Sequence, residues 1–317
     1  MWFKNIQLFK LKTHFALDPT DLDAQLHAKR KIDCPTHQQS NQGWMSPYGK
    51  HSDRLVVEQN KMYLLAFCDE EKIIPSSVIM EKTQDKIAAL EQEECRKLSQ
   101  KERKSIKETV FASLLPLAFS KTKVTQLILD VEEGWILVDC TSRNQAERCL
   151  DFLRSTLGSL PIKAIDCQHD VAFTLSNWLI DGILPNHLML LNRCEMFDDK
   201  QARSTIKFTD HELHADHVVN HLKHGHKVGK VGIKWHEKLS FSITCDLECH
   251  GIKYHDMDEV KDCLDNQQIL QKEAVVDTEF ALIAPLYRQL IDNITTWFGG
   301  LSQSTSSTNQ PIAAHES

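Results

Sequence analysis

Cationic side chains are concentrated between residues 96 and 123. Eight lysines and arginines stand there against two glutamates, so the segment carries about +6, whereas the whole chain carries -7 and the remainder about -13. Cations gathered in an acidic chain favour binding of a polyanion at one surface, while the rest of the molecule repels it. The cations are Arg96, Lys97, Lys101, Arg103, Lys104, Lys107, Lys121 and Lys123.

The spacing of these cations predicts a two-sided helix. At about 100° per residue, one face of the segment 97–114 presents Lys97, Lys101, Lys104 and Lys107. The opposite face presents Ile106, Val110 and Leu114, which can pack on a core. Arg103 falls at the edge of that apolar side, where its stem can lie on apolar surface with its head in water. The alternative interpretation is a solvated surface helix that binds nothing.

A second cationic face is expected at residues 227–244. This segment is predicted to form a hairpin in which apolar and polar side chains alternate, so that one side is apolar. The other side offers ammonium groups, hydroxyls and a glycine, which suit phosphate oxygens but read no base sequence. Its candidate phosphate ligands are Lys227, Lys230 and Lys234. An ordinary half-exposed hairpin is the alternative.

Six histidines lie within sixteen residues: His211, His214, His217, His221, His224 and His226. The first five are spaced by three or four residues, which predicts a ladder along one helix face that could bind Zn or Ni. The string HELH at 211–214 is not the HExxH zinc-protease motif, because position 215 is Ala. A solvent-facing ladder, or imidazoles that become charged near phosphate, are the other interpretations.

Other chemical signatures are weak or missing. Cys245, Cys249, His250, His255 and Cys263 have loose zinc-like spacing, but no second tight pair completes it, so neither metal nor cofactor is expected. The motifs GxxxxGK[ST], GxGxxG and GxSxG are absent. Aromatic residues, at 7%, do not interleave with the basic run, which favours a duplex backbone over stacking on single strands.

Composition indicates an ordinary globular protein. No apolar run approaches the roughly 20 residues that a membrane span needs, and the first residues lack the apolar stretch of a secretory signal. A cytoplasmic protein with no membrane partner is expected. The ten cysteines are scattered, mostly in apolar runs, and are therefore expected to be reduced core thiols.

The elements that would position these residues are mixed. Strands or hairpins are predicted at 2–12, 61–68, 126–140, 187–191, 204–208 and 227–244. Helices are predicted at 19–31, 78–115, 144–157, 175–180, 210–223 and 279–298. Pro116 should end the second helix, Gly158 should close the third, and Asp210 should cap the fifth. Residues 34–53 read as a loop. Without a regular βαβ repeat, the fold class is α+β.

The chain is expected to divide into five parts. These are an N-terminal α+β part (1–75), a long helical basic segment (76–123), an α+β domain (124–200), a second α+β domain with a C-terminal helix (201–298), and a polar disordered tail (299–317).

Several strings together resemble the bacterial recombination-associated RdgC family. They include WFKN (2–5), EEKIIPS (70–76), SLLPLAFS (113–120) and LGSLP (157–161). The resemblance covers nearly the full length up to about Gly300, and these strings are shared with no common superfold. One departure is Leu117, which follows Pro116 where the family can carry Arg. Lys121 or Lys123 could compensate for the missing cation.

The resemblance implies a fold and an activity. Mixed sheets with long helices would form a horseshoe-like subunit, and two subunits a ring-shaped homodimer whose basic hole encircles duplex DNA. Family members bind DNA with little sequence preference, limit access of the recombinase RecA, and have no attributed catalytic reaction. Lys72 and the long helices would lie near the hole, and Phe119 in a subunit contact that closes the ring. Nucleoid association in the cytoplasm follows, and direct contact with RecA stays open.

Two other classes of function compete with this interpretation. One is a metal-dependent DNA-processing nuclease that uses the histidine cluster or scattered carboxylates. The other is a protein-interaction module whose basic helix meets an acidic partner.

Overall fold

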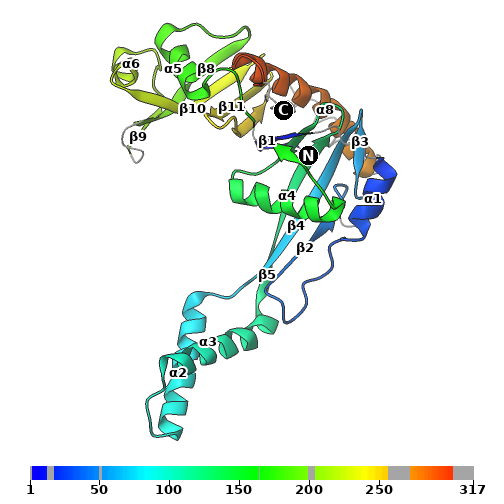
Figure 1. Ribbon diagram of the computed structural model, residues 1–317, viewed down its shortest axis with the longest axis vertical. Helices are drawn as coiled ribbons and strands as arrows, with labels where there is room; N and C mark the ends of the chain where they lie inside the picture. The colour runs from blue at the N-terminus through cyan, green and yellow to red at the C-terminus, as the bar shows by residue number, and fades with distance from the viewer. Residues whose placement is uncertain are drawn as a thin grey trace, which may run out of the picture. The chain divides into compact units, whose positions relative to one another are not determined.

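The computed structural model describes residues 2–12, 18–49, 52–163, 165–198, 204–255 and 272–302. The chain divides into two compact units. Unit 1 comprises Met1–Lys163 and Val260–Ala284, and unit 2 comprises Ala164–Glu259 and Pro285–Ser317. Both units combine helices with antiparallel strands, which confirms the α+β class (Figure 1).

Unit 1 is built on an antiparallel sheet with the strand order β2-β4-β5-β6-β1. The strands are β1 (Asn5–Leu11), β2 (Ser40–Met45), β4 (Met62–Ile73), β5 (Phe119–Asp130) and β6 (Trp135–Val138). Two short strands extend it, β3 (Val57–Gln59) on β4 and β7 (Ile162–Lys163) on β1. The hairpin predicted at 126–140 is confirmed, with Gly134 at a positive φ of 67° in its turn.

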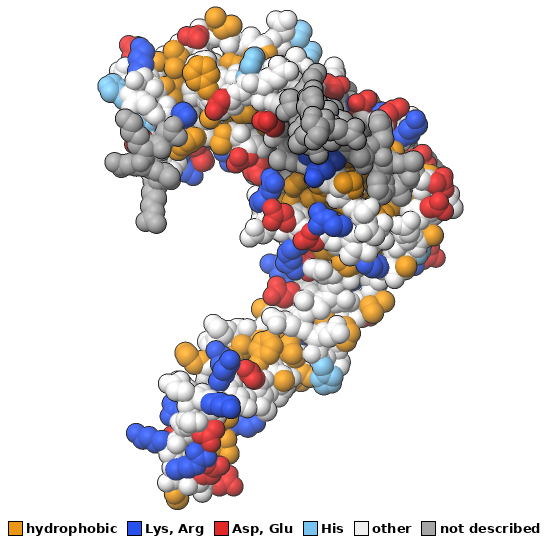
Figure 2. Space-filling model, in the orientation of Figure 1, with side chains coloured by type: hydrophobic (Ala, Val, Ile, Leu, Met, Phe, Trp, Pro, Cys, Tyr) orange, Lys and Arg blue, Asp and Glu red, His pale blue; other side chains and the backbone are white. Residues whose placement is uncertain are grey.

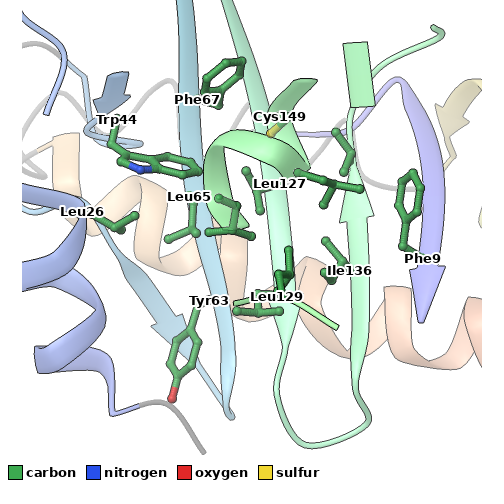
Figure 3. Close-up of a cluster of buried hydrophobic side chains, with 14 of the residues drawn as sticks. Phe9, Leu26, Trp44, Tyr63, Leu65, Phe67, Leu127, Leu129, Ile136 and Cys149 are labelled. Carbon is green, nitrogen blue, oxygen red and sulfur yellow. The ribbon is translucent and has the colours of Figure 1, made fainter. Parts of the chain in front are cut away.

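The core of unit 1 forms where helices α1 (Pro19–His27) and α4 (Arg143–Leu157) cover the sheet. Alternate residues of β4, such as Leu65 and Phe67, point toward Cys149 of α4 and Trp44 of β2 (Figure 3). Every residue of β4 from Met62 to Glu70 is buried, because both faces of the sheet are covered there. The predicted close of α4 is confirmed at Gly158, which has a φ of 78°.

Beyond the core, β4 and β5 continue as a ribbon that carries two helices and that β2 flanks as far as Glu71 (Figure 1). The six residues from Phe119 to Val124 are all exposed. The helices are α2 (Ser76–Glu93) and α3 (Gln100–Leu114), followed by the 3-10 turn η1 (Leu115–Leu117) that contains Pro116. We call α2, α3 and the residues between them the helical hairpin.

The prediction of a continuous helix over 78–115 is wrong, because one helix ends at Glu93 and the next begins at Gln100. Cys95 adopts a positive φ of 49°, which an α-helix does not allow. Ser99 then starts α3 with a capping box, in which its hydroxyl accepts from the amide of Glu102 and the Glu102 carboxylate accepts from the amide of Ser99. The apolar spacing runs through this break, so periodicity alone did not reveal it.

Unit 2 contains a second antiparallel sheet with the order β12-β11-β10-β8-β9. Its strands are β8 (Leu188–Asp198), β9 (Thr205–Thr209), β10 (His226–Trp235), β11 (Leu239–Thr244) and β12 (Cys249–Tyr254). Helices α5 (Val171–Asp181) and α6 (Asp216–Lys223) contact β10 (Figure 1). The β10–β11 hairpin confirms the prediction for 227–244.

The alternation in β10 separates a core face from an open face. Val231, Ile233 and Trp235 are fully buried, whereas Lys230 and Lys234 are half-exposed. Helix α8 (Lys272–Trp297) contributes its part after Pro285 to this unit. The end of that helix packs on α5, where the rings of Trp178 and Phe298 stack at 5.7 Å.

Three further predictions are corrected. The loop expected at 34–53 contains β2, and β12 was not predicted. Helix α6 begins at Asp216 with Ala215 as its N-cap, so Asp210, which has a positive φ of 57°, does not cap it. The predicted disordered tail lies almost wholly outside the described residues.

Nine cysteines lie in the described part of the chain, and all are free; Cys263 lies outside it. Burial raises the pKa of the Cys194 thiol to about 12 and also raises the pKa of Cys149 and Cys249, so these thiols stay protonated. No helix within the described residues has the length and apolar character to cross a bilayer.

Candidate nucleic-acid interface

The predicted two-sided character of the basic helix is confirmed for α3. Val110 is buried and Ile106 half-buried, whereas the lysines are exposed. The position of Lys97 is corrected, because it precedes the helix and lies in the segment between α2 and α3. The exposed cations of this surface, here called the α3 lysines, are Lys97, Lys101, Lys104 and Lys107.

Both arginines of the run are held within the helical hairpin. The guanidinium of Arg96 lies 2.7 Å from the carboxylate of Glu94 and 2.6 Å from that of Glu102. Arg103 lies 2.9 Å from Glu91 and donates to the carbonyl of Leu98 at 3.2 Å. The arginines therefore stabilise the turn between the helices, and the α3 lysines are the cations left to meet solvent.

The charge of the helical hairpin is lower than the run 96–123 indicates. Helix α2 contacts α3 and adds more acidic than basic residues. Residues 76–123 together hold ten Lys or Arg and seven Asp or Glu, which gives +3. Figure 2 shows cationic and acidic side chains interspersed over this part of the molecule, at the lower end of the view. The sharp segregation expected from the sequence is thus an overestimate.

The remaining cations of the first segment lie on the ribbon. Lys121 and Lys123 are exposed on β5, where they stand opposite Glu71 and Asp69 of β4. The carboxylate of Asp69 is also 2.7 Å from the guanidinium of Arg148. These acidic neighbours weaken the attraction of Lys121 and Lys123 for a polyanion.

Lys72 has a structural role in this arrangement. Its ammonium group donates to the carbonyl oxygen of Pro35 at 3.1 Å and to that of Thr36. The side chain thereby ties the segment before β2 to the ribbon. A phosphate could reach Lys72 only alongside these carbonyls.

The second cationic face lies on the open side of the unit 2 sheet. Lys230 lines a depression of about 370 Å³ together with Gly232 and Ser242. Lys234 forms an ion pair with Glu237, and Lys227 is half-buried. Of the three predicted ligands, Lys230 is therefore the one that the structure places in a concave surface.

An exposed apolar surface lies where the ribbon meets the helical hairpin. Phe119 is 87% exposed and Leu117 79% exposed. Ile73, which pairs with Phe119 in the ribbon, is 49% exposed. Large apolar side chains gathered in solvent indicate a contact surface. In the sequence, Leu117 was considered only as the position of a missing cation. Its apolar character, two residues before Phe119, could have indicated a contact surface.

The predicted histidine ladder is wrong, because His211 and His214 precede α6, and His224 and His226 follow it. Three imidazoles instead surround Phe208, with ring centroids about 6 Å from it: His211 at 5.9 Å, His217 at 6.2 Å and His221 at 5.9 Å. Within the described residues, no three His, Cys, Asp or Glu side chains are placed to hold a metal ion.

The chain is similar to known proteins over nearly its whole length. The family model described as "Putative exonuclease, RdgC" matches residues 1–301. A protein of Yersinia pestis, "Recombination-associated protein RdgC", is 32% identical over 304 residues, covering 96% of this chain and 99% of that protein. A protein of Yersinia enterocolitica with the same name shows the same identity and coverage.

The chain belongs to the RdgC family. Two of its RdgC-like strings prove to be neighbours in space. EEKIIPS runs from the end of β4 into α2, and SLLPLAFS runs from the end of α3 through η1 into β5. Register pairs Ile73 with Phe119 and Lys72 with Ser120. The strings therefore meet at the base of the helical hairpin, where the apolar surface lies.

Proposed function

We propose that this RdgC-family protein binds duplex DNA without sequence preference, as a ring-shaped homodimer, and limits the access of RecA to DNA. The observation that carries the proposal is the set of exposed α3 lysines on a chain whose relatives are named recombination-associated. No catalysed reaction is part of the proposal, and nucleoid association in the cytoplasm would follow from DNA binding.

The chemistry of the α3 lysines suits a phosphate backbone. Each ammonium that neutralises a phosphate releases condensed counterions, which favours binding and makes it depend on salt. Such contacts position a protein on DNA and do not read bases. If about six phosphates are neutralised, the logarithm of the binding constant falls with the logarithm of salt concentration at a slope near -5.

The homodimer would use the exposed apolar surface. A second copy covering Phe119, Leu117 and Ile73 would remove these side chains from water, which is favourable in proportion to the area buried. A twofold dimer presents the same cationic surface from both sides of a duplex. Once closed, the ring would leave DNA only by opening an interface or reaching an end, and it would exclude RecA by occupancy alone.

The direct test compares linear with covalently closed circular duplex DNA. The protein should slide off linear DNA when challenged with salt but stay on circles of the same sequence. Affinity for unrelated duplexes should be equal and should fall steeply with salt. A flat salt response, a strong preference for one sequence, or equal loss from circles and linear DNA would contradict the proposal.

The description of the matching family model favours a second candidate, a DNA exonuclease. Incubation of the purified protein with linear and supercoiled DNA plus Mg, Mn or Zn separates the two candidates. Shortening or nicking of DNA that a chelator abolishes would establish the enzyme. If the DNA stays intact under conditions in which it is fully bound, the ring-shaped DNA-binding protein remains as the candidate.

A further inference from the structure

The depression on the open face of the unit 2 sheet gathers cations that the sequence did not connect. We call it the Arg193 groove; its volume is about 370 Å³. All five strands of the sheet contribute to it. The residues that matter here are Arg193, Lys207, Lys230, Gly232, Ser242 and His250.

A bulge in β8 places Arg193 over the middle of the sheet. Val231 of β10 pairs with Cys194 of β8, and Ile233 pairs with Leu190. Three β8 residues, 191–193, therefore stand opposite the single residue Gly232. A Cβ at position 232 would lie 2.6 Å from Cγ of Arg193 and 2.7 Å from its Nε. Glycine thus leaves the room through which the arginine side chain crosses β10.

The Nε of Arg193 is buried and has no hydrogen-bond partner among the described residues. Buried donors are almost always paired, so an orphaned guanidinium N–H at the edge of a groove points to an acceptor supplied by a ligand. Nearby carboxylates are already engaged. Glu195 lies 3.2 Å from the ammonium of Lys207, and Glu248 lies 3.0 Å from Nε2 of His250.

Lys230 adds a second cation at the groove. In the part of the chain that the structure describes, no carboxylate lies within ion-pair distance of its ammonium, although Glu195 is its neighbour on β8. Ser242, directly opposite Gly232 on β11, offers a hydroxyl in the same depression. A guanidinium, an ammonium and a hydroxyl around a small concave surface match the oxygens of a phosphate group.

We propose that the Arg193 groove binds one phosphate group of a nucleic-acid backbone, with Arg193 and Lys230 as its cationic ligands. This inference rests on the proposed DNA binding and adds a contact outside the helical hairpin. A free phosphate presents the same chemistry, and the two sources are separated by the test below.

The first variant is Arg193→Gln, with Arg154→Gln as the matched control. Arg154 lies on α4, is exposed and pairs with Asp151, so its loss changes the net charge equally. Arg193→Gln should weaken binding to two unrelated duplexes by the same factor and, because the proposed homodimer has two such grooves, should make the salt slope shallower by about 2. Arg154→Gln should leave the slope unchanged. If both variants bind duplex with the same affinity and the same salt slope, the proposed contact between Arg193 and the phosphate backbone is wrong.

The second variant, Gly232→Ala, keeps every charge but forces the Arg193 side chain out of its path. It should reproduce the loss seen in Arg193→Gln, whereas an effect of net charge alone predicts wild-type binding. Thermal unfolding checks that this variant is folded, and if it is not, the arginine variant decides alone.

Inorganic phosphate distinguishes the source of the ligand. Its ³¹P signal, titrated with wild-type protein and with Arg193→Gln, reports direct binding. If the wild type broadens the signal, the variant does not, and no duplex is bound, the groove is a site for free phosphate and the proposed function fails. If duplex binds but neither duplex affinity nor the phosphate signal responds to Arg193→Gln, the groove proposal fails while DNA binding stands.

Discussion

Glu102 holds the start of α3 through three contacts. Its carboxylate accepts from the amide and the hydroxyl of Ser99, each at 2.7 Å, and pairs with Arg96. The hydrogen bond from Arg96, followed by those from Ser99, lowers the pKa of Glu102 to about 2. A lowered carboxyl pKa means that the contacts stabilise the folded hairpin above the ordinary pKa and are lost as pH falls toward 2.

We therefore predict a local acid transition in the helical hairpin. Between about pH 4.5 and pH 2, amides at the start of α3 should lose protection from hydrogen exchange, earlier than the core strands do. In Glu102→Gln these amides should exchange roughly a few-fold faster at neutral pH, because the charge-assisted bonds from Arg96 and Ser99 become weaker neutral ones. Glu108→Gln, an exposed change on the same helix, is the control. Equal protection in both variants would show that the cap does not hold the turn.

At the scale of the element, α3 acts as a carrier of cations. Its capping box fixes where the helix begins, and its buried Val110 fixes which face packs on the rest of the hairpin. The α3 lysines lie exposed to solvent, away from that packed face. In the proposed DNA binding, their number would matter more than their exact positions, since each phosphate contact would contribute a similar, non-specific increment.

Reversing three of these lysines tests the element. The change Lys97→Glu, Lys101→Glu and Lys104→Glu should leave folding intact, because all three side chains are exposed. In the proposed homodimer three lysines are reversed in each subunit, so up to six contacts are lost, and the salt slope of duplex binding should move from about -5 toward zero.

The matched control reverses three exposed lysines elsewhere: Lys12, Lys223 and Lys238. It makes the same change in net charge and therefore reveals any effect of general repulsion. If the two triple variants bind alike, the α3 lysines are not the contact surface.

At the scale of the whole molecule, the proposed ring depends on a second copy. Phe119 is the most exposed large apolar side chain of the described residues. An aromatic anchor buried at the centre of an interface commonly contributes about 2 kcal/mol or more to binding. Leu117 and Ile73 would surround it on the same surface.

Phe119→Ala should therefore shift the protein from dimer toward monomer, with a dissociation constant raised at least about thirtyfold. Analytical ultracentrifugation over a range of concentrations measures this shift. Phe173→Ala removes another exposed aromatic side chain, on α5, and should leave the dimer unchanged. A monomeric wild type would remove the ring proposal, and an unchanged Phe119→Ala dimer would place the interface elsewhere.

Strands and helices with a clear period were predictable because burial of one face imposes that period. The β10–β11 hairpin and α4 with Gly158 are examples, and the family was evident from strings such as EEKIIPS. The break between α2 and α3 was missed because apolar residues occur at helical spacing on both sides of it. The prediction of a histidine ladder was wrong because it assumed a helix that starts at Asp210, whereas α6 starts at Asp216.

The sequence by itself determined the class of fold, the family, and the excess of cations near residue 100, since these depend on composition and local pattern. Only the tertiary structure decided which cations are available. Arg96, Arg103 and Lys72 are engaged by groups that folding brings to them, whereas the α3 lysines form no hydrogen bond or ion pair with any residue that the structure describes. Arg193 gained its place through a bulge in β8, and strand register is a long-range property that local sequence does not specify.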